Sequence, residues 1–145
     1  MKILISGSSG FIGYHLSKFL INKGYNVLGL DNNKKNYSKK IKNKRLLFLK
    51  KKRKFSYFNV DLTNFKHLEN IFLKNLPDIV FHLAGQPGVL YSFKNPKSYK
   101  LNNVVATKNI CKLSLKYKVK KFFFASSSSV YGDQKKFPIK ETYIT

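Results

Sequence analysis

Short apolar runs alternate along the chain with longer segments whose apolar residues recur at helical spacing. The apolar runs, which we expect to form strands, cover residues 3–5, 25–30, 55–60, 79–83 and 122–125. Helical spacing predicts helices at residues 11–23, within residues 32–54, from residue 64 and from residue 95 to about residue 117. Strands that alternate with helices indicate an α/β fold, a doubly wound parallel sheet with helices on both faces. The fifth strand is expected to be buried like the others where a sixth strand covers it, and to become an apolar sheet edge in a truncated chain.

Capping residues mark the ends of several predicted helices. The first helix carries four apolar residues that we expect to form one buried stripe: Ile12, Leu16, Phe19 and Leu20. Gly24 is suited to the left-handed conformation that ends this helix. Thr63 or Asn64 can cap the helix that follows the third strand. Pro96 is suited to the first turn of the last and longest helix.

Three glycines follow the first strand, at the point where a helix is expected to begin. Gly7, Gly10 and Gly13 give the spacing G-x-x-G-x-x-G, which differs from the G-x-G-x-x-G of the standard dinucleotide fingerprint. A glycine turn of this kind presents bare backbone N–H groups at a helix N-terminus, where the helix dipole favours an anion such as a pyrophosphate. The spacing alone is weak evidence for a nucleotide site.

Polar or small residues follow the other predicted strands as well. Asp31 ends the second strand at the place where an acid can bind the ribose hydroxyls of a dinucleotide, and an acid there favours NAD over NADP. Its other interpretation is a turn-forming aspartate. Asp61 can meet an adenine edge or serve a turn, and the pair Ala84-Gly85 leaves room for a ligand. Because ligands bind at the carboxyl ends of the strands in open α/β sheets, these positions together are stronger evidence than the glycines alone.

Composition limits the classes of protein. The chain has 145 residues, one domain's worth, and no apolar run long enough to span a bilayer. Its one cysteine, Cys111, excludes an internal disulfide, fits the reducing cytoplasm and is expected to be a packing residue. We expect His82 to be a core or sheet histidine. No metal site is expected.

The net charge of +23 comes almost entirely from lysine, and the only arginines are Arg45 and Arg53. The densest basic cluster covers residues 34–54, where we expect a loop followed by a short helix with a solvated face. The alternative is a footprint for nucleic acid or an anionic membrane. We do not expect a nucleic-acid partner, because the lysines are not interleaved with stacking aromatic residues in a recognisable RNA-binding motif.

Five motifs resemble those of the extended short-chain dehydrogenase/reductase superfamily, in particular its NAD-dependent epimerase/dehydratase family. They are Gly7-Ser8-Ser9-Gly10-Phe11-Ile12-Gly13, Asp31-Asn32, Asp61-Leu62, His82-Leu83-Ala84-Gly85 and Ser126-Ser127-Ser128-Ser129-Val130-Tyr131-Gly132. The segment 86–92 with Asn95-Pro96 is most similar to UDP-glucuronate 4-epimerases, although that subgroup usually has arginine at the position of Leu90. The fold implied by the resemblance is the Rossmann fold, truncated here after about the fifth strand.

The resemblance implies that NAD is the cofactor and that its binding residues are Gly7, Gly10, Phe11, Ile12, Gly13, Asp31, Asn32, Asp61, Leu62, Leu83, Ala84, Gly85 and Asn102. In this scheme the glycines line the pyrophosphate, Asp31 binds the adenosine ribose and Asp61-Leu62 contact adenine. Residues 83–85 lie along the cofactor, and Asn102 helps to hold it. Ser127 is the implied catalytic residue, a hydrogen-bonding partner of the reacting sugar hydroxyl, whereas Tyr131 is not the catalytic tyrosine.

The family's catalytic Tyr-x-x-x-Lys pair falls beyond Thr145 at the spacing that the family has. We therefore expect residues 1–145 to be the N-terminal portion of an NAD-binding Rossmann domain that lacks the C-terminal substrate domain and is inactive alone. The complete enzyme is expected to be a nucleotide-sugar 4-epimerase that acts on a UDP-sugar, either as a homodimer or with a complementing C-terminal piece. The alternatives are a nucleotide-sugar dehydratase or reductase, or a non-catalytic module that binds NAD or nucleic acid.

Overall fold

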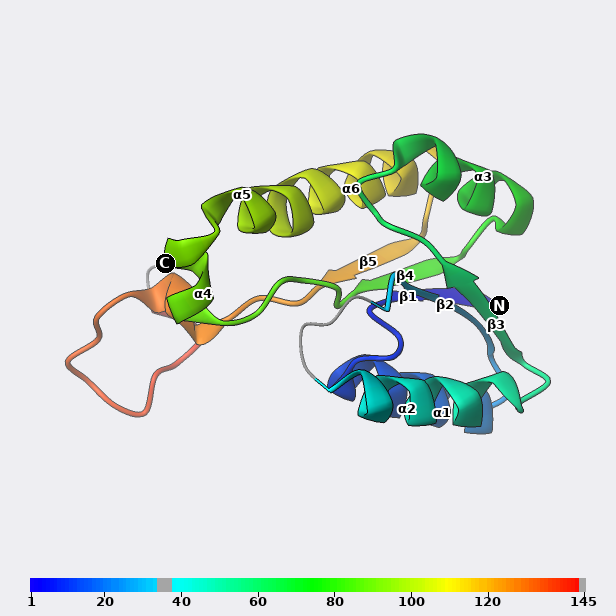
Figure 1. Cartoon of the computed structure of the whole chain (residues 1–145), viewed down its shortest axis with the longest axis horizontal. Coiled ribbons are helices and arrows are strands. Elements are labelled where there is room, and N and C mark those ends of the chain that lie inside the picture. Colours follow the sequence, from blue (N-terminus) through cyan, green and yellow to red (C-terminus); the bar gives the residue numbers. More distant parts are fainter. Residues whose placement is uncertain (34–37, 144–145) are drawn as a thin grey trace.

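The computed structural model describes residues 1–33 and 38–143, and its centre is a parallel sheet (Figure 1). The five strands are β1 (Lys2–Ser6), β2 (Asn26–Asp31), β3 (Phe55–Asn59), β4 (Ile79–His82) and β5 (Lys121–Phe124). They lie in the order β3-β2-β1-β4-β5, and every neighbouring pair is parallel. The strand order therefore reverses between β1 and β4, which is the topological switch point of a doubly wound sheet.

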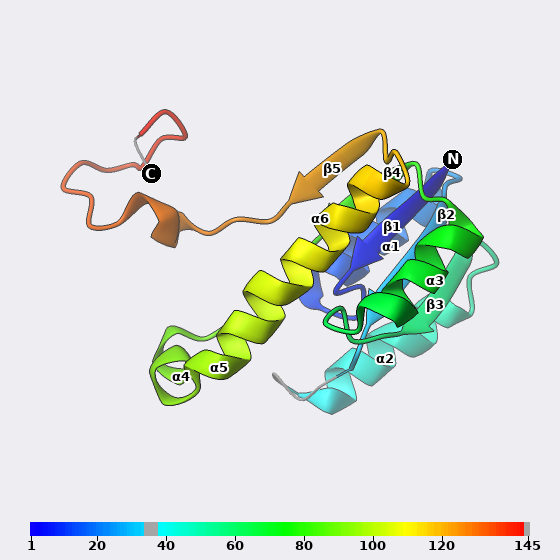
Figure 2. The ribbon, with the colours of Figure 1, turned by 90° about the horizontal axis from the view of Figure 1, so that it is seen from above.

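Helices cover both faces of the sheet (Figures 1 and 2). One face carries α1 (Phe11–Asn22) and α2 (Lys39–Lys50), and the other carries α3 (Phe65–Asn75) and α6 (Ala106–Lys116). Two short helices, α4 (Val89–Lys94) and α5 (Pro96–Tyr99), precede a π-helical segment at Lys100–Val105 that continues into α6. A 3₁₀ turn at Ser128–Tyr131 follows β5. The predicted α/β class and the doubly wound Rossmann arrangement are confirmed.

The two faces hold two separate hydrophobic cores, because successive side chains of a strand point to opposite faces. In β1, Ile3 and Ile5 belong to the core under α1 and α2, whereas Leu4 belongs to the core under α3 and α6. All three are at most 1% exposed. An apolar run without alternation is what a strand buried on both faces requires.

The predicted helix ends agree with the structure where a cap is visible. The side chain of Asn64 accepts a hydrogen bond from the backbone N–H of His67 at 3.1 Å, so Asn64 rather than Thr63 caps α3. Gly24 follows α1 with a φ of +89°. Pro96 occupies the first turn of α5.

The predicted buried stripe of the first helix is wrong in two of its four positions. Ile12 and Phe19 are 64% and 56% exposed, and the residues that α1 buries are Gly13, Ser17 and Leu20. A Cβ on Gly13 would overlap the carbonyl oxygen of Gly7, so this small residue lets the helix lie directly against the glycine turn. With Gly13 against the turn, Ile12 and Phe19 face outward, whereas Leu20 reaches the core.

β5 is the edge of the sheet, as expected for a truncated chain, and it is not buried like the other strands. Phe123 and Phe124 are 46% and 58% exposed. Beyond β5, residues 125–143 run away from the sheet instead of packing on it (Figure 2). This exposure agrees with the expectation of an apolar edge, because no strand of the described residues pairs with the outer side of β5.

Two further features were not predicted. Helix α4 lies in a segment that we assigned no element, and the long helix expected from residue 95 to about residue 117 is interrupted by the π-helical segment. The expected basic loop contains residues 34–37, which lie outside the described residues. No helix in the described ranges combines the length and the apolar character that a bilayer span requires.

Candidate functional site

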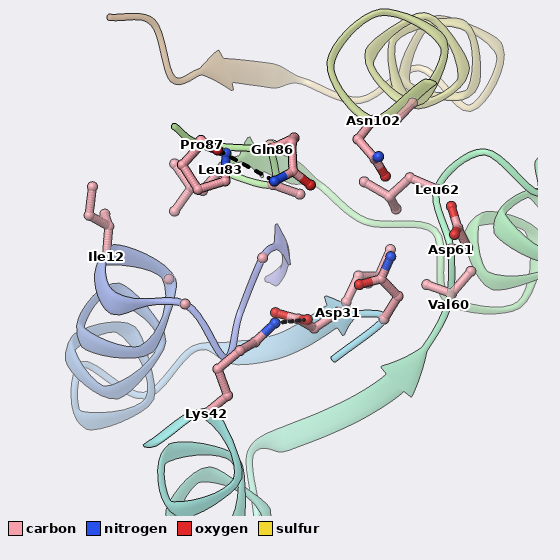
Figure 3. A pocket seen from close by; sticks show the side chains of 18 of the residues that line it. Ile12, Asp31, Lys42, Val60, Asp61, Leu62, Leu83, Gln86, Pro87 and Asn102 are labelled. Carbon is pink, nitrogen blue, oxygen red and sulfur yellow. Dashed lines mark hydrogen bonds and ion pairs between the residues drawn. The ribbon is translucent and has the colours of Figure 1, made fainter. Parts of the chain in front are cut away.

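A pocket of about 360 Å³ opens at the carboxyl ends of the strands, at the switch point between β1 and β4 (Figure 3). All thirteen residues predicted to bind a cofactor line it, from Gly7 of the glycine turn to Asn102 of the π-helical segment. Six lining residues were not predicted: Leu30, Lys42, Val60, Gln86, Pro87 and Ala106. The segments that follow β1, β2, β3 and β4 thus converge on one cavity.

The glycine turn is shaped by two close contacts. Gly7 has a φ of +72°, which a residue with a side chain rarely adopts, and a Cβ there would lie 3.0 Å from the backbone nitrogen of Ala84. The N–H groups of Gly7 and Ser8 both donate to the carbonyl oxygen of Leu30, at 2.7 and 3.2 Å. The turn is therefore fixed against the ends of both β2 and β4.

Helix α1 begins at this turn with Gly10 as its N-cap, which offers no side chain to the first N–H groups of the helix. The first turn of α1 contains Phe11, Ile12 and Gly13 and has no acidic residue. Backbone N–H groups at such a helix start point along the dipole toward the space in front of it, which here is the pocket. This end of the pocket is suited to an anionic group.

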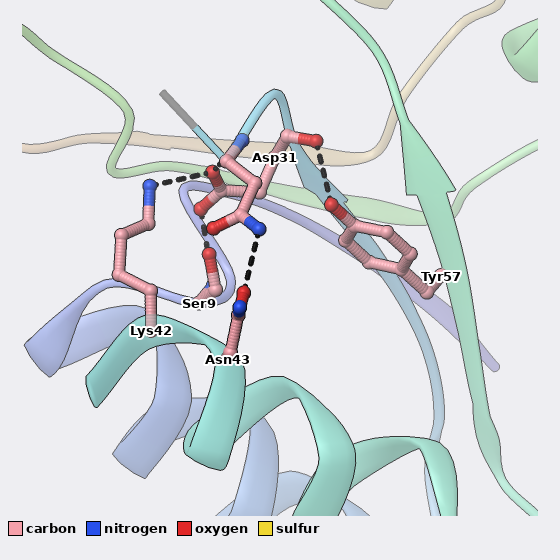
Figure 4. A network of polar contacts seen from close by, with 6 residues as sticks. Ser9, Asp31, Lys42, Asn43 and Tyr57 are labelled. Atoms are coloured by element: carbon pink, nitrogen blue, oxygen red, sulfur yellow. Dashed lines mark hydrogen bonds and ion pairs between the residues drawn. The ribbon is translucent and has the colours of Figure 1, made fainter. Parts of the chain in front are cut away.

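Asp31, at the end of β2, holds the centre of a polar network (Figure 4). Its Oδ2 accepts the N–H of Ser9 at 3.1 Å, and its Oδ1 accepts the N–H of Asn33 at 2.8 Å and the ammonium of Lys42 at 2.9 Å. The backbone carbonyl of Asp31 also accepts the hydroxyl of Tyr57 at 2.9 Å. Burial and the nearby carboxylate raise the pKa of Tyr57 to about 12, so this hydroxyl remains a donor.

Lys42 is the charged pocket residue that the sequence analysis missed. Most lysines and arginines of the basic cluster are exposed, as expected, but the side chain of Lys42 is only 6% exposed and lies against Asp31 in the pocket wall. Lys42 shares the buried face of α2 with Leu46 and Leu49. Their helical spacing from Lys42 was the signal that could have separated this lysine from its neighbours.

At the end of β3, Asp61 is held within its own turn. Its Oδ1 accepts hydrogen bonds from the N–H of Thr63 at 3.0 Å and from the Thr63 hydroxyl at 2.7 Å. The next residue, Leu62, is anchored through its carbonyl oxygen by the side-chain amide of Asn109 at 2.9 Å. This arrangement presents Asp61 and Leu62 to one side of the pocket (Figure 3).

At the end of β4, a chain of buried hydroxyl and imidazole groups fixes the pocket segment 83–84. The Ser6 Oγ accepts the N–H groups of Leu83 and Ala84, at 3.0 and 3.1 Å. Its own hydrogen is therefore donated to Nδ1 of His82, 2.7 Å away, and the Nε2–H of His82 is donated to the Thr107 hydroxyl at 2.9 Å. Burial lowers the pKa of the His82 imidazole to about 4, so the ring is neutral at pH 7. His82 is a core histidine, as predicted.

The π-helical segment fixes the other end of the same loop. The side chain of Asn103 accepts the N–H of Gln86 at 2.6 Å and donates to the carbonyl oxygen of Gln86 at 3.2 Å. Its neighbour Asn102 lines the pocket, with its amide nitrogen donating to the Ser98 carbonyl at 2.7 Å. An inserted residue in a helix of this kind often marks a functional site, and here it places two consecutive asparagines against the pocket and its loop.

Ser127, the predicted catalytic residue, is the one site residue that the structure does not bring to the pocket. It caps the 3₁₀ turn after β5, where its exposed hydroxyl accepts the N–H of Ser129 at 3.2 Å. The structure thus gathers the predicted cofactor residues and leaves Ser127 on the segment that extends from the sheet edge (Figure 2).

Comparisons with known proteins agree with this architecture. The family model described as GDP-mannose 4,6 dehydratase matches residues 4–145. The UDP-glucuronate 4-epimerase of Thermodesulfobacterium geofontis is 40% identical over 131 residues, which cover 90% of this chain and 41% of the relative. The UDP-glucose 4-epimerase of Caenorhabditis elegans is 38% identical over 146 residues, which cover 97% of this chain and 42% of the relative.

Solved structures give the same result. The UDP-glucuronic acid 4-epimerase of Bacillus cereus, crystallised in complex with UDP-glucuronic acid and NAD, has a TM-score of 0.89 and 32% sequence identity to this chain. The match covers 99% of this chain and 45% of that protein, so the chain spans less than half the length of the proteins it resembles. Because the family model matches nearly every residue, the chain belongs to the GDP-mannose 4,6 dehydratase family, within the extended short-chain dehydrogenase/reductase superfamily that its motifs resemble.

Proposed function

We propose that this chain is the NAD-binding portion of a nucleotide-sugar 4-epimerase of the UDP-glucuronate or UDP-hexose type. The observation that carries the proposal is the pocket at the switch point, which gathers the glycine turn, Asp31, Asp61 and Asn102 from segments far apart in the sequence. The relatives named as UDP-sugar 4-epimerases, one of them crystallised with NAD, support both the cofactor and the class of substrate.

The residues present fit NAD. The start of α1 supplies N–H groups for the pyrophosphate, and Gly7 and Gly13 keep that approach free of side chains. Asp31 lies at the strand end where a carboxylate meets the adenosine ribose hydroxyls. Asp61 and Leu62 would contact the adenine.

The remaining pocket residues would guide the rest of the dinucleotide. Leu83, Ala84 and Gly85 would lie along it on a loop held at both ends, by Ser6 and by Asn103. Asn102 would help to hold the cofactor from the π-helical segment. We also assign Phe11, Ile12 and Asn32 to this site, since all three line the same cavity.

In the complete enzyme, bound NAD would supply the hydride acceptor for transient oxidation of the sugar at C4. Ser127 would hydrogen-bond the reacting hydroxyl, once the rest of the protein brings its segment over the pocket. The family's Tyr-x-x-x-Lys pair would supply the general base, and it falls outside residues 1–145 at the family's spacing. We propose that residues 1–145 supply the NAD site of that enzyme.

Isothermal titration of the purified chain with NAD tests the proposal. Gly13→Ala places a Cβ on the Gly7 carbonyl and displaces the turn, so the affinity for NAD is expected to fall at least about tenfold. Lys44→Ala, at an exposed position of α2 that does not line the pocket, is the control. If a folded chain bound no NAD, even with the C-terminal part of a relative supplied, the proposal would be wrong.

A partner for the sheet edge also follows from the proposed function. Phe123 and Phe124 are exposed on β5, and an unpaired apolar edge strand is prone to pair with another chain. We propose that the C-terminal portion of the complete enzyme covers this edge, that the complete enzyme forms a homodimer and that it works in the cytoplasm. Sedimentation velocity is expected to show association of the chain alone, and Phe124→Lys is expected to reduce it. A monomer at high concentration would contradict the proposed edge contact.

A further inference from the structure

The layer formed by α1 and α2 carries charge of one sign on its outer side. Residues 1–60 contain fifteen lysines and arginines but a single acid, Asp31, which is buried. Neither α1 nor α2 contains an acidic residue. On the other layer, in contrast, Lys116 of α6 is paired with Glu69 of α3 at 2.6 Å. The cations on α1 and α2 are therefore not balanced by carboxylates of the same helices.

The same layer exposes large apolar side chains. Phe19 of α1 and Leu47 of α2 are 56% and 61% exposed. Exposed lysines occur on both helices and directly after α2. We call this set of exposed side chains the α1/α2 surface, and it comprises Lys18, Phe19, Lys40, Lys44, Leu47 and Lys51.

The α1/α2 surface is continuous across the two helices. From Lys40 to Lys51, its members on and directly after α2 follow one another at intervals of four, three and four residues, which places them on one side of the helix. The opposite side of α2 packs into the core. Helix α1 lies beside α2, since the ring of Tyr14 lies 5.9 Å from the ring of Phe48 (Figure 1).

An anionic bilayer is the partner that fits this combination of side chains. Exposed phenylalanine and leucine side chains can insert at the level of the lipid head groups, while the lysines around them reach the lipid phosphates with their ammonium groups. Each lysine near such a surface adds electrostatic attraction. No described residue covers the outer side of α1 and α2, and none of the six residues of the α1/α2 surface lines the pocket (Figure 1).

A nucleic acid fits the α1/α2 surface less well. Stacking on bases requires free ring faces, but the ring of Phe48 lies beneath the ammonium groups of Lys18 and Lys52, at 5.5 and 4.9 Å. Leu47 has no ring to offer a base. A second copy of this chain is disfavoured at this surface, because two surfaces of the same positive charge repel each other.

We propose that the α1/α2 surface docks this protein on an anionic membrane, with Phe19 and Leu47 inserted among the head groups and the lysines bound to lipid phosphates. The core beneath the surface includes side chains of β1, β2 and β3, whereas β5 forms the opposite edge of the sheet. A covering of the β5 edge would therefore not need to reach this surface. The inference goes beyond the proposed function and does not depend on NAD binding.

Co-sedimentation of the chain with lipid vesicles tests the inference. The wild-type chain is expected to bind vesicles of equal parts phosphatidylglycerol and phosphatidylcholine at least about tenfold more tightly than vesicles of phosphatidylcholine alone. The triple variant Lys40→Gln, Lys44→Gln and Lys51→Gln should lose at least about tenfold in affinity for the anionic vesicles. A matched triple variant removes the same charge from exposed positions of α3 and α6 and should lose less than about threefold: Lys66→Gln, Lys108→Gln and Lys112→Gln.

Leu47→Gln tests the apolar contact and should weaken binding to the anionic vesicles at least about threefold. Leu115→Gln is its matched control, because Leu115 is 81% exposed on α6, and it should leave the binding unchanged. All the substituted side chains are exposed, so every variant is expected to fold, and circular dichroism verifies it.

The inference is wrong if the wild-type chain binds neutral and anionic vesicles equally, or binds neither. It is also wrong if the two triple variants lose the same affinity, or if Leu47→Gln keeps full vesicle binding. In the last case, loss of binding to single-stranded DNA in the α2 triple variant would identify a nucleic acid as the partner instead. Titration with NAD keeps the proposed function separate, because the α2 triple variant should bind NAD as the wild type does.

Discussion

Two regions of the molecule have similarly apolar sequences but very different surroundings. In the region from β1 to β4, helices cover both faces of the sheet, and Leu4, Ile5 and Val80 are completely buried. In β5 and the residues after it, Phe124 and Phe137 are 58% and 76% exposed. The difference shows that an apolar run is buried only where a neighbouring strand and helices on both faces are present to cover it.

The two regions also differ in the ligand to which we assign their residues. Every residue assigned to the cofactor lies before β5, in the region with complete cores. Ser127, the only residue assigned to the substrate, lies after it. The first region therefore contains all the residues that we assign to the cofactor. The second region has no further strand beside β5 among the described residues.

The largest contrast is expected in stability. Phe72→Ala removes a completely buried ring from the core under α3 and α6 and should lower the free energy of unfolding by about 3–5 kcal/mol. Phe124→Ala, the same substitution in the exposed strand, should lower it by less than about 1 kcal/mol. Urea denaturation of both variants measures the difference. Equal losses would show that β5 is as well packed as the first region.

The next largest effect is a dependence of stability on pH that originates at His82. Its pKa is about 4 in the folded chain and 6.5 in its ordinary range, so the unfolded chain takes up the proton first as the pH falls. Stability is therefore lost between pH 6.5 and pH 4, by about 3 kcal/mol for the whole shift. Urea denaturation across this range measures it.

Two variants assign that pH dependence. His82→Gln should flatten the curve between pH 6.5 and pH 4, whereas His67→Gln, at an exposed position on α3, should leave it unchanged. If both variants kept the slope of the wild type, the buried chain from Ser6 to Thr107 would not hold a neutral imidazole.

The smallest effect is expected at the surface ion pair between Lys116 and Glu69. These groups lie 2.6 Å apart, and the contact raises the pKa of Lys116, but its side chain is 61% exposed. Solvent screening removes most of the interaction, so Glu69→Gln should leave the urea midpoint unchanged within error. A clear fall in the midpoint, or its dependence on salt, would show that this pair matters to the packing of α3 against α6.

The fold class and the position of the proposed cofactor residues at one edge of the sheet could both be predicted from the sequence, because both depend on local patterns. Strand ends in a parallel sheet share one edge, so Asp31 and Asp61 could be placed near the glycine turn without coordinates. Their binding roles remain predictions.

Features that depend on contacts between distant segments could not be predicted in this way. The outward position of Ile12 and Phe19 accompanies the contact of Gly13 with the glycine turn, and the burial of Lys42 follows from where α2 lies against β2. Composition alone cannot distinguish one buried lysine from the exposed lysines of the same basic run. The contact between Asn103 of the π-helical segment and Gln86 likewise joins residues that lie seventeen positions apart in the sequence.

Hydrogen–deuterium exchange of the chain with and without NAD tests most directly the claim that the cofactor site is complete before β5. The account predicts slower exchange of the backbone amides at residues 7–13 and 83–86, which border the pocket, and unchanged exchange at residues 125–143. Unchanged exchange around the glycine turn at saturating NAD, or protection confined to the residues after β5, would contradict it.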